Sequence, residues 1–74
     1  MTVVELQQLL VTTLVRARGD SRTKWRRAIG EIKLYSRDTH PHCNWEVRAA
    51  GTMREIAAVE AAVDTIRADH PWVG

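Results

Sequence analysis

Two histidines and a cysteine lie within four residues in the motif His40-Pro41-His42-Cys43. Imidazole nitrogen and thiolate sulfur are ligands of structural zinc, and His70 could supply a fourth group. Such sites usually draw their ligands from two spaced pairs, but the chain has no second pair of the CxxC or HxxxH type. In an extended segment, His42 and Cys43 would also point to opposite faces. We therefore expect Cys43 to be a small buried hydrophobe, and a metal site at His40, His42 and Cys43 is the weaker alternative.

The same cysteine is a candidate nucleophile because histidines lie beside it in the sequence. A reactive thiol needs solvent exposure, whereas the alternation of Cys43 with Trp45 and Val47 predicts a side chain that faces the core. The chain has no serine nucleophile motif and no glycine-rich loop that could hold a phosphate. We expect a non-catalytic protein that uses no cofactor.

Basic side chains are concentrated in one part of the chain. Eight of the eleven lie between Arg16 and Arg37 beside two acids, so this stretch carries a charge of +6. The remaining residues carry three basic and seven acidic side chains, a charge of −4, and the total is +2. Such an uneven distribution of charge indicates the kind of partner that the protein would bind, and we expect this partner to be acidic.

The basic stretch has two interpretations. In the first, it binds the phosphates of a nucleic acid or the carboxylates of an acidic protein. The residues expected to make this contact are Arg18, Arg22, Lys24, Arg26 and Arg27, with Lys33, Tyr35 and Arg37 on a second, weaker patch of the outer hairpin face. In the second, the arginines pair with carboxylates of the last helix, namely Glu55, Glu60 and Asp64, or lie favourably near the negative end of the first helix, as Arg16 and Arg18 would. The protein would then be an adaptor or regulatory subunit that contacts other proteins, and its basic patch would be incidental.

Two capping boxes predict where the first and last helices begin. In Thr2-Val3-Val4-Glu5 and in Thr52-Met53-Arg54-Glu55, a threonine and a glutamate three residues later can bind each other's backbone amides. An apolar stripe at helical spacing follows each box. We expect one helix at about 3–17, ended by Gly19, and another from 53 to about 69, ended before Pro71.

Between these helices the pattern changes to alternation, which predicts an antiparallel hairpin. The two strands lie within 31–35 and 43–49, and turn-forming residues join them. We expect one face of the hairpin to lie on the core through Ile32, Leu34, Cys43, Trp45, Val47 and Ala49. We expect the other face to be polar, with Lys33, Tyr35, Arg37, His42, Asn44, Glu46 and Arg48.

The segment 21–29 fits two structures. As a short helix over 22–29, it is capped by Ser21 and ended by Gly30, and this is the structure we favour. As a strand, it would alternate from Trp25 to Ile29, with a bulge at Gly30. Trp25 faces inward in both, and only if it were exposed among its basic neighbours would it be a candidate for stacking on bases.

The sequence as a whole predicts a single α+β domain over residues 1–74. The order is α-β-β-α with a short extra helix at about 22–29, and two helices pack on one face of the hairpin. We expect Trp72 and Val73, beyond the last helix, to fold back onto the core.

The open edges of a two-stranded sheet make a homodimer a candidate assembly. One unpaired cysteine favours a reducing cytoplasm, and the absence of a long apolar run predicts no membrane contact.

Overall fold

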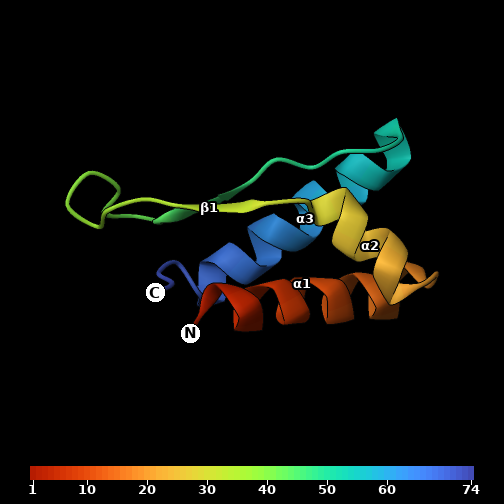
Figure 1. The fold of residues 1–74 in the computed structure, drawn as a ribbon, viewed down its shortest axis with the longest axis horizontal. Coiled ribbons are helices and arrows are strands. Elements are labelled where there is room, and N and C mark those ends of the chain that lie inside the picture. The colour runs from red at the N-terminus through yellow and green to blue at the C-terminus, as the bar shows by residue number, and fades with distance from the viewer.

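Three helices and a two-stranded antiparallel hairpin form the protein in the computed structural model, which describes residues 1–74. The elements follow in the order α1 (Val3–Arg18), α2 (Arg22–Ile29), β1 (Ile32–Leu34), β2 (Trp45–Val47) and α3 (Met53–Asp69). Figure 1 shows α1 and α3 packed side by side, with α2 at one end of the molecule. The predicted α+β class, the hairpin and the extra short helix are confirmed. None of the three helices has the length and apolar character that crossing a membrane would require.

Helices α1 and α3 both begin at the predicted capping boxes. At α1, the Glu5 amide donates to the Thr2 hydroxyl over 3.1 Å, and the Glu5 carboxylate accepts from the Thr2 amide over 2.9 Å. Thr52 and Glu55 repeat these bonds at α3, with lengths of 3.1 and 3.0 Å. The boxes satisfy amides that the first turn of a helix leaves without partners, so each helix has a fixed first residue.

Residues 22–29 form a helix, so the alternative strand is wrong. The Ser21 hydroxyl accepts from the Lys24 amide over 3.1 Å at the beginning of α2. Gly30 ends the helix with a φ of +66°, a conformation that glycine adopts without strain. The inward face of α2 consists of Trp25, Ala28 and Ile29, all of them buried.

The core lies among the three helices and is closed by one strand and the C-terminal segment. Fourteen apolar residues form a single buried cluster. Leu6, Leu10 and Leu14 line α1, while Trp45 from β2 and Val73 complete the cluster. Cys43, Val47 and Ala49 are partly buried against it, in agreement with their predicted inward face.

The position of Leu34 on β1 differs from the predicted one. It was expected to lie on the core with Ile32, but its side chain is 45% exposed. The hairpin continues beyond the core at its loop, as Figure 1 shows, so the end of β1 has little beneath it. Leu34 lies next to Gly74 instead, because the C-terminal segment passes alongside this end of the hairpin.

Asn44 and Trp72 also differ from the prediction, and the same segment is the reason. Asn44 was expected on the polar outer face, but it is only 5% exposed. Its amide side chain donates to the Val73 carbonyl and accepts from the Val73 amide, each over 2.8 Å. Residues 71–74 therefore run beside the start of β2, which buries Val73 and leaves Trp72 45% exposed.

Candidate functional site

The exposed side of α2 is lined with basic side chains because the apolar residues of this helix all turn inward. Arg22, Arg26 and Arg27 are exposed, while Lys24 lies on the flank nearest α3. Arg18, the last residue of α1, is also exposed and lies close to this flank. We call the group Arg18, Arg22, Lys24, Arg26 and Arg27 the basic surface.

The arginines of the basic surface are not neutralised by carboxylates. The protein has two ion pairs, Lys24–Asp20 at 2.6 Å and Arg67–Asp64 at 3.9 Å. Nine of its eleven basic side chains therefore have no carboxylate within ion-pair distance. The proposed pairing with the last helix is wrong for these arginines. Asp64 pairs with Arg67 within α3, Glu55 accepts from the Thr52 amide, and Glu60 forms no ion pair. Arg16 and Arg18 do lie in the last turn of α1, where the helix dipole favours a basic side chain, as the second interpretation expected.

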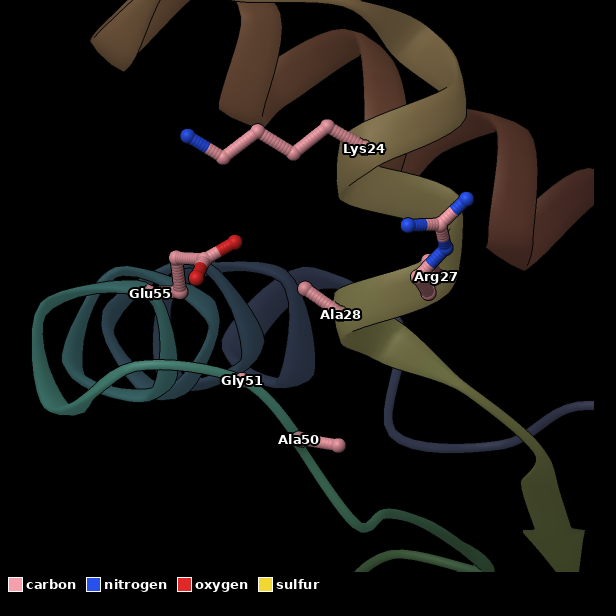
Figure 2. Close-up of a pocket in the computed structure, with 6 residues that line it drawn as sticks. All are labelled: Lys24, Arg27, Ala28, Ala50, Gly51 and Glu55. Carbon is pink, nitrogen blue, oxygen red and sulfur yellow. The ribbon is translucent and has the colours of Figure 1, made fainter.

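A cleft separates α2 from the beginning of α3, and it is built from two adjoining cavities. The first has a volume of about 310 Å³ and is lined by Lys24, Arg27, Ala28, Ala50, Gly51 and Glu55. The second has a volume of about 270 Å³ and is lined by Arg18, Asp20, Lys24, Trp25, Arg54, Glu55 and Ala58. Lys24 and Glu55 belong to both. Figure 2 shows Lys24 extending from α2 on the side of the Glu55 carboxylate.

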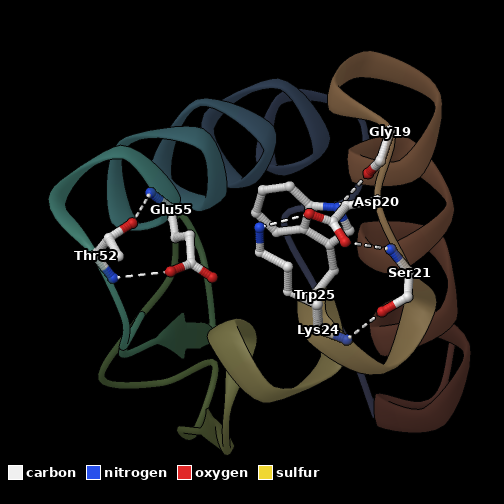
Figure 3. Close-up of polar contacts among 7 residues, drawn as sticks. All are labelled: Gly19, Asp20, Ser21, Lys24, Trp25, Thr52 and Glu55. Carbon is white, nitrogen blue, oxygen red and sulfur yellow. Dashed lines mark hydrogen bonds and ion pairs between the residues drawn. The ribbon is translucent and has the colours of Figure 1, made fainter.

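Both carboxylates in the cleft are held by hydrogen bonds within the protein (Figure 3). Asp20 accepts from Lys24 over 2.6 Å and from the Ser21 amide over 2.9 Å. The bond from Lys24 is the main reason that the pKa of Asp20 is lowered, and it raises the pKa of Lys24 in return. The Thr52 amide and hydroxyl lower the pKa of Glu55. At neutral pH the cleft therefore contains two fixed negative charges and four positive ones, those of Arg18, Lys24, Arg27 and Arg54.

Trp25 is part of the core and presents no surface for stacking. It is 4% exposed, and its indole nitrogen donates to the Gly19 carbonyl over 2.7 Å. This bond ties the turn after α1 to the first turns of α2, as Figure 3 shows. The expected inward position of Trp25 is confirmed, and its role is to fix the angle between two helices that carry the arginines.

The other three residues of the predicted site lie away from α2. Lys33 is opposite Glu46 in the hairpin, Tyr35 follows β1, and Arg37 lies in the hairpin loop. In Figure 1 this loop and α2 occupy opposite ends of the long axis. The structure brings Arg18 and the α2 residues together and separates them from Arg37.

At the hairpin, polar and aromatic side chains bind one another. The Tyr35 hydroxyl donates to Glu46 over 2.7 Å, which is the main cause of its raised pKa. The Tyr35 ring stacks on His40 with a centroid distance of 4.2 Å. The Arg37 guanidinium lies over the Trp72 ring at 5.7 Å. These contacts occupy two of the groups that were expected to bind a partner.

The candidate metal ligands do not converge. No group of three or more histidine, cysteine, aspartate or glutamate side chains lies close enough together to hold a metal ion. Cys43 is half-buried, and its thiol donates to the Trp45 carbonyl over 3.4 Å. His40 is stacked on Tyr35, whereas His42 is exposed. The geometry offers no support for a metal site at these residues.

Arg54 is the one cation of the cleft that the sequence analysis did not select. It lies in the first turn of α3, where the helix dipole is positive and a basic side chain is unfavourable. It was overlooked because Arg54 is far from the basic stretch in sequence and reaches the cleft only through the packing of α2 against α3.

No family model, curated protein or solved structure matches this chain. Inference about its function therefore depends on the geometry described above. The feature that stands out in that geometry is a set of arginines that have no carboxylate partner and are gathered around one short helix.

Proposed function

We propose that the protein is a non-catalytic module that binds nucleic acid through the phosphate backbone, using the basic surface. The observation that carries the proposal is the lack of any ion pair at Arg18, Arg22, Arg26 and Arg27. Arg18, Arg26 and Arg27 lie in the last turns of their helices, where the helix dipole favours a cation, but no carboxylate offsets their charge or that of Arg22. The basic side chains therefore also repel one another. A polyanion relieves that repulsion and releases its own counterions on binding.

The composition of the basic surface favours a nucleic acid over an acidic protein. Protein interfaces usually have a desolvated centre with aromatic or aliphatic anchors. The side chains between these arginines are small or polar, such as Thr23 and Ser21, and Trp25 is buried. Arginine also matches the phosphate group, since its planar fork donates two parallel hydrogen bonds.

The same surface favours recognition of the backbone over recognition of bases. Single strands are commonly held by bases stacked on exposed aromatic rings. The three tryptophans offer no such ring here, because Trp25 and Trp45 are buried and Trp72 lies by the hairpin loop, bonded to Pro41. We therefore favour a duplex, bound with little dependence on sequence. The single cysteine fits a reducing compartment such as the cytoplasm.

An amide chemical-shift titration with a short duplex of mixed sequence tests this proposal. We expect shifts at residues 18–27 and at the beginning of α3, and none at the hairpin loop. For about four phosphate contacts, affinity should fall about a hundredfold between about 50 and 200 mM salt. Shifts with an acidic peptide but none with the duplex would favour the acidic protein. An absence of shifts with both would reject the proposal.

A second candidate function is self-association at the opposite end of the molecule. Met1, Leu34 and Trp72 are each between 43% and 45% exposed, and the Gly74 amide bonds the Met1 carbonyl beside Leu34. Exposed apolar surface of this kind is typical of interfaces between proteins. Light scattering after size exclusion tests it: a dimer that Trp72→Ser converts to a monomer would support it, and a monomer at every concentration would reject it.

A further inference from the structure

The cleft between α2 and the start of α3 draws its cations from all three helices. Arg18 is the last residue of α1, Lys24 and Arg27 belong to α2, and Arg54 lies in α3. Lys24 lines both cavities, with Arg27 on one side and Arg18 and Arg54 on the other. The fold therefore brings together four basic side chains that the sequence distributes over 37 residues, from 18 to 54.

The hydrogen-bonding capacity of this cleft is largely unused. Arg18, Arg27 and Arg54 form no ion pair, and none of them donates a hydrogen bond to another side chain. The two carboxylates in the cleft are already engaged, Asp20 by Lys24 and Ser21, and Glu55 by Thr52. A ligand that enters would meet three guanidinium groups whose donors are otherwise solvated.

We propose that the cavity lined by Arg18, Lys24 and Arg54 in this cleft holds one phosphate group of the bound duplex. The inference rests on the proposed function and adds Arg54 to the binding residues. The side chains that line this cavity make the contact, and the capping box uses the amides of Thr52 and Glu55 within the protein. Binding of an anion also compensates the unfavourable position of Arg54 at the positive end of the helix.

Asp20 reduces the positive charge of the cleft in which the phosphate would bind. Its carboxylate holds the Lys24 ammonium at 2.6 Å and offsets part of its charge. Asp20 adopts a φ of +71°, which asparagine tolerates well. Asp20→Asn therefore keeps the backbone and the acceptor for the Ser21 amide while removing the negative charge. Duplex affinity should rise about threefold at low salt, because Lys24 is released toward the phosphate.

The test measures binding of a fluorescent duplex of mixed sequence by anisotropy for single variants. Arg18→Gln and Arg54→Gln should each weaken binding about tenfold. Each should reduce the slope of log affinity against log salt by less than one, because the remaining cations still hold the same phosphate. Arg48→Gln is the matched control, since Arg48 is exposed after β2 and outside the cleft. It should change affinity less than about twofold. Thermal unfolding of each variant confirms that it is folded.

Three results would overturn the inference, and they separate it from the proposed function. If Arg18→Gln and Arg54→Gln bind like the parent while Arg26→Gln binds weakly, the cleft holds no phosphate but the basic surface still binds the duplex. If Arg48→Gln weakens binding as much as Arg54→Gln, the effect is one of total charge and not of the cleft. If the parent protein does not bind the duplex at low salt, the proposed function fails as well.

Discussion

At the hairpin end of the molecule, the polar and aromatic side chains bind other parts of the same chain, whereas the arginines around α2 have almost no internal partners. Asn44 bonds both backbone groups of Val73, Tyr35 bonds Glu46, and the Trp72 indole bonds the Pro41 carbonyl. Around α2, Arg22 makes a single bond to Thr12, and Arg26 and Arg27 make none.

This difference separates groups that hold the fold together from groups that we propose contact a partner. A buried hydrogen bond contributes to stability because its loss leaves a polar atom without water. An exposed guanidinium loses little when it is replaced, and removing one of several neighbouring cations relieves repulsion. Substitutions at the two ends should therefore have opposite consequences: loss of stability at the hairpin end and loss of binding at α2.

Asn44→Ala should have the largest effect on stability. The substitution leaves the Val73 amide and carbonyl buried without partners, which costs about 2–4 kcal/mol for two groups. That is most of the stability expected of a domain of this size. Urea unfolding followed by tryptophan fluorescence measures the loss. His42→Ala, at an exposed neighbouring position, is the control and should change stability by less than about 0.5 kcal/mol. Equal stability of the two variants would contradict a structural role for Asn44.

The triple variant Arg22→Gln, Arg26→Gln, Arg27→Gln should lose binding and keep its fold. We expect duplex affinity at low salt to fall by more than about a hundredfold, because three phosphate contacts are removed. The free energy of unfolding should change by no more than about 1 kcal/mol. The matched control removes the same charge elsewhere, through Lys33→Gln, Arg37→Gln and Arg48→Gln, and should bind within about threefold of the parent. A triple variant at α2 that unfolds would show that these arginines are structural.

Thr52→Ala should have a moderate effect that depends on pH. Loss of the N-cap hydroxyl costs about 1 kcal/mol. Because the pKa of Glu55 is lowered in the folded protein, its contribution to stability is complete above its unfolded pKa of about 4.5. That contribution disappears as the pH falls through the folded pKa of Glu55. Thr52→Ala already lacks part of this contribution, so its stability should fall less than that of the parent over the same pH range. Urea midpoints from neutral to acid pH measure this, with Thr23→Ala as the exposed control. An identical acid response in the parent and Thr52→Ala would contradict it.

The smallest expected effect is on the ionisation of Tyr35, the only tyrosine of the chain. Its hydroxyl donates to Glu46, so its pKa is raised above the ordinary value of 10.0. The contribution of this bond to stability is therefore complete below pH 10 and disappears as the pH rises through the folded pKa. Glu46→Gln should lower the pKa toward 10.0, as followed by tyrosinate absorbance in an alkaline titration. An unchanged titration would mean that the bond is not maintained in solution.

The elements that the sequence predicts well are those set by signals within a few residues. Thr2 and Glu5 fix the start of α1, and Thr52 and Glu55 fix the start of α3, because each box closes within four residues. Ser21 and Gly30 likewise decide that α2 is a helix, even though its apolar alternation also fits a strand. The capping residues therefore decided between helix and strand where the spacing of apolar residues fitted both.

The features that the sequence does not predict depend on contacts between distant segments. Asn44 is buried because residues 71–74 lie beside it. No local sequence pattern predicts this contact between Asn44 and the C-terminal segment. In the candidate site, the arginines of α2 were selected correctly as exposed cations, but Arg54 was not selected. Its contribution depends on the packing of α2 against α3, which encloses the cleft. The sequence also left open whether the weaker patch on the hairpin adjoins the arginines of α2, and in the structure the hairpin loop and α2 lie at opposite ends of the molecule.

The salt dependence of duplex binding, measured by fluorescence anisotropy on the parent protein and the α2 triple variant, distinguishes a phosphate-binding surface from an incidental one. We expect the parent to bind with a slope of log affinity against log salt of about −4, and the slope of the triple variant to be smaller by about three. A slope near zero for the parent, or equal slopes for the two proteins, would contradict a role for the basic surface in binding nucleic acid.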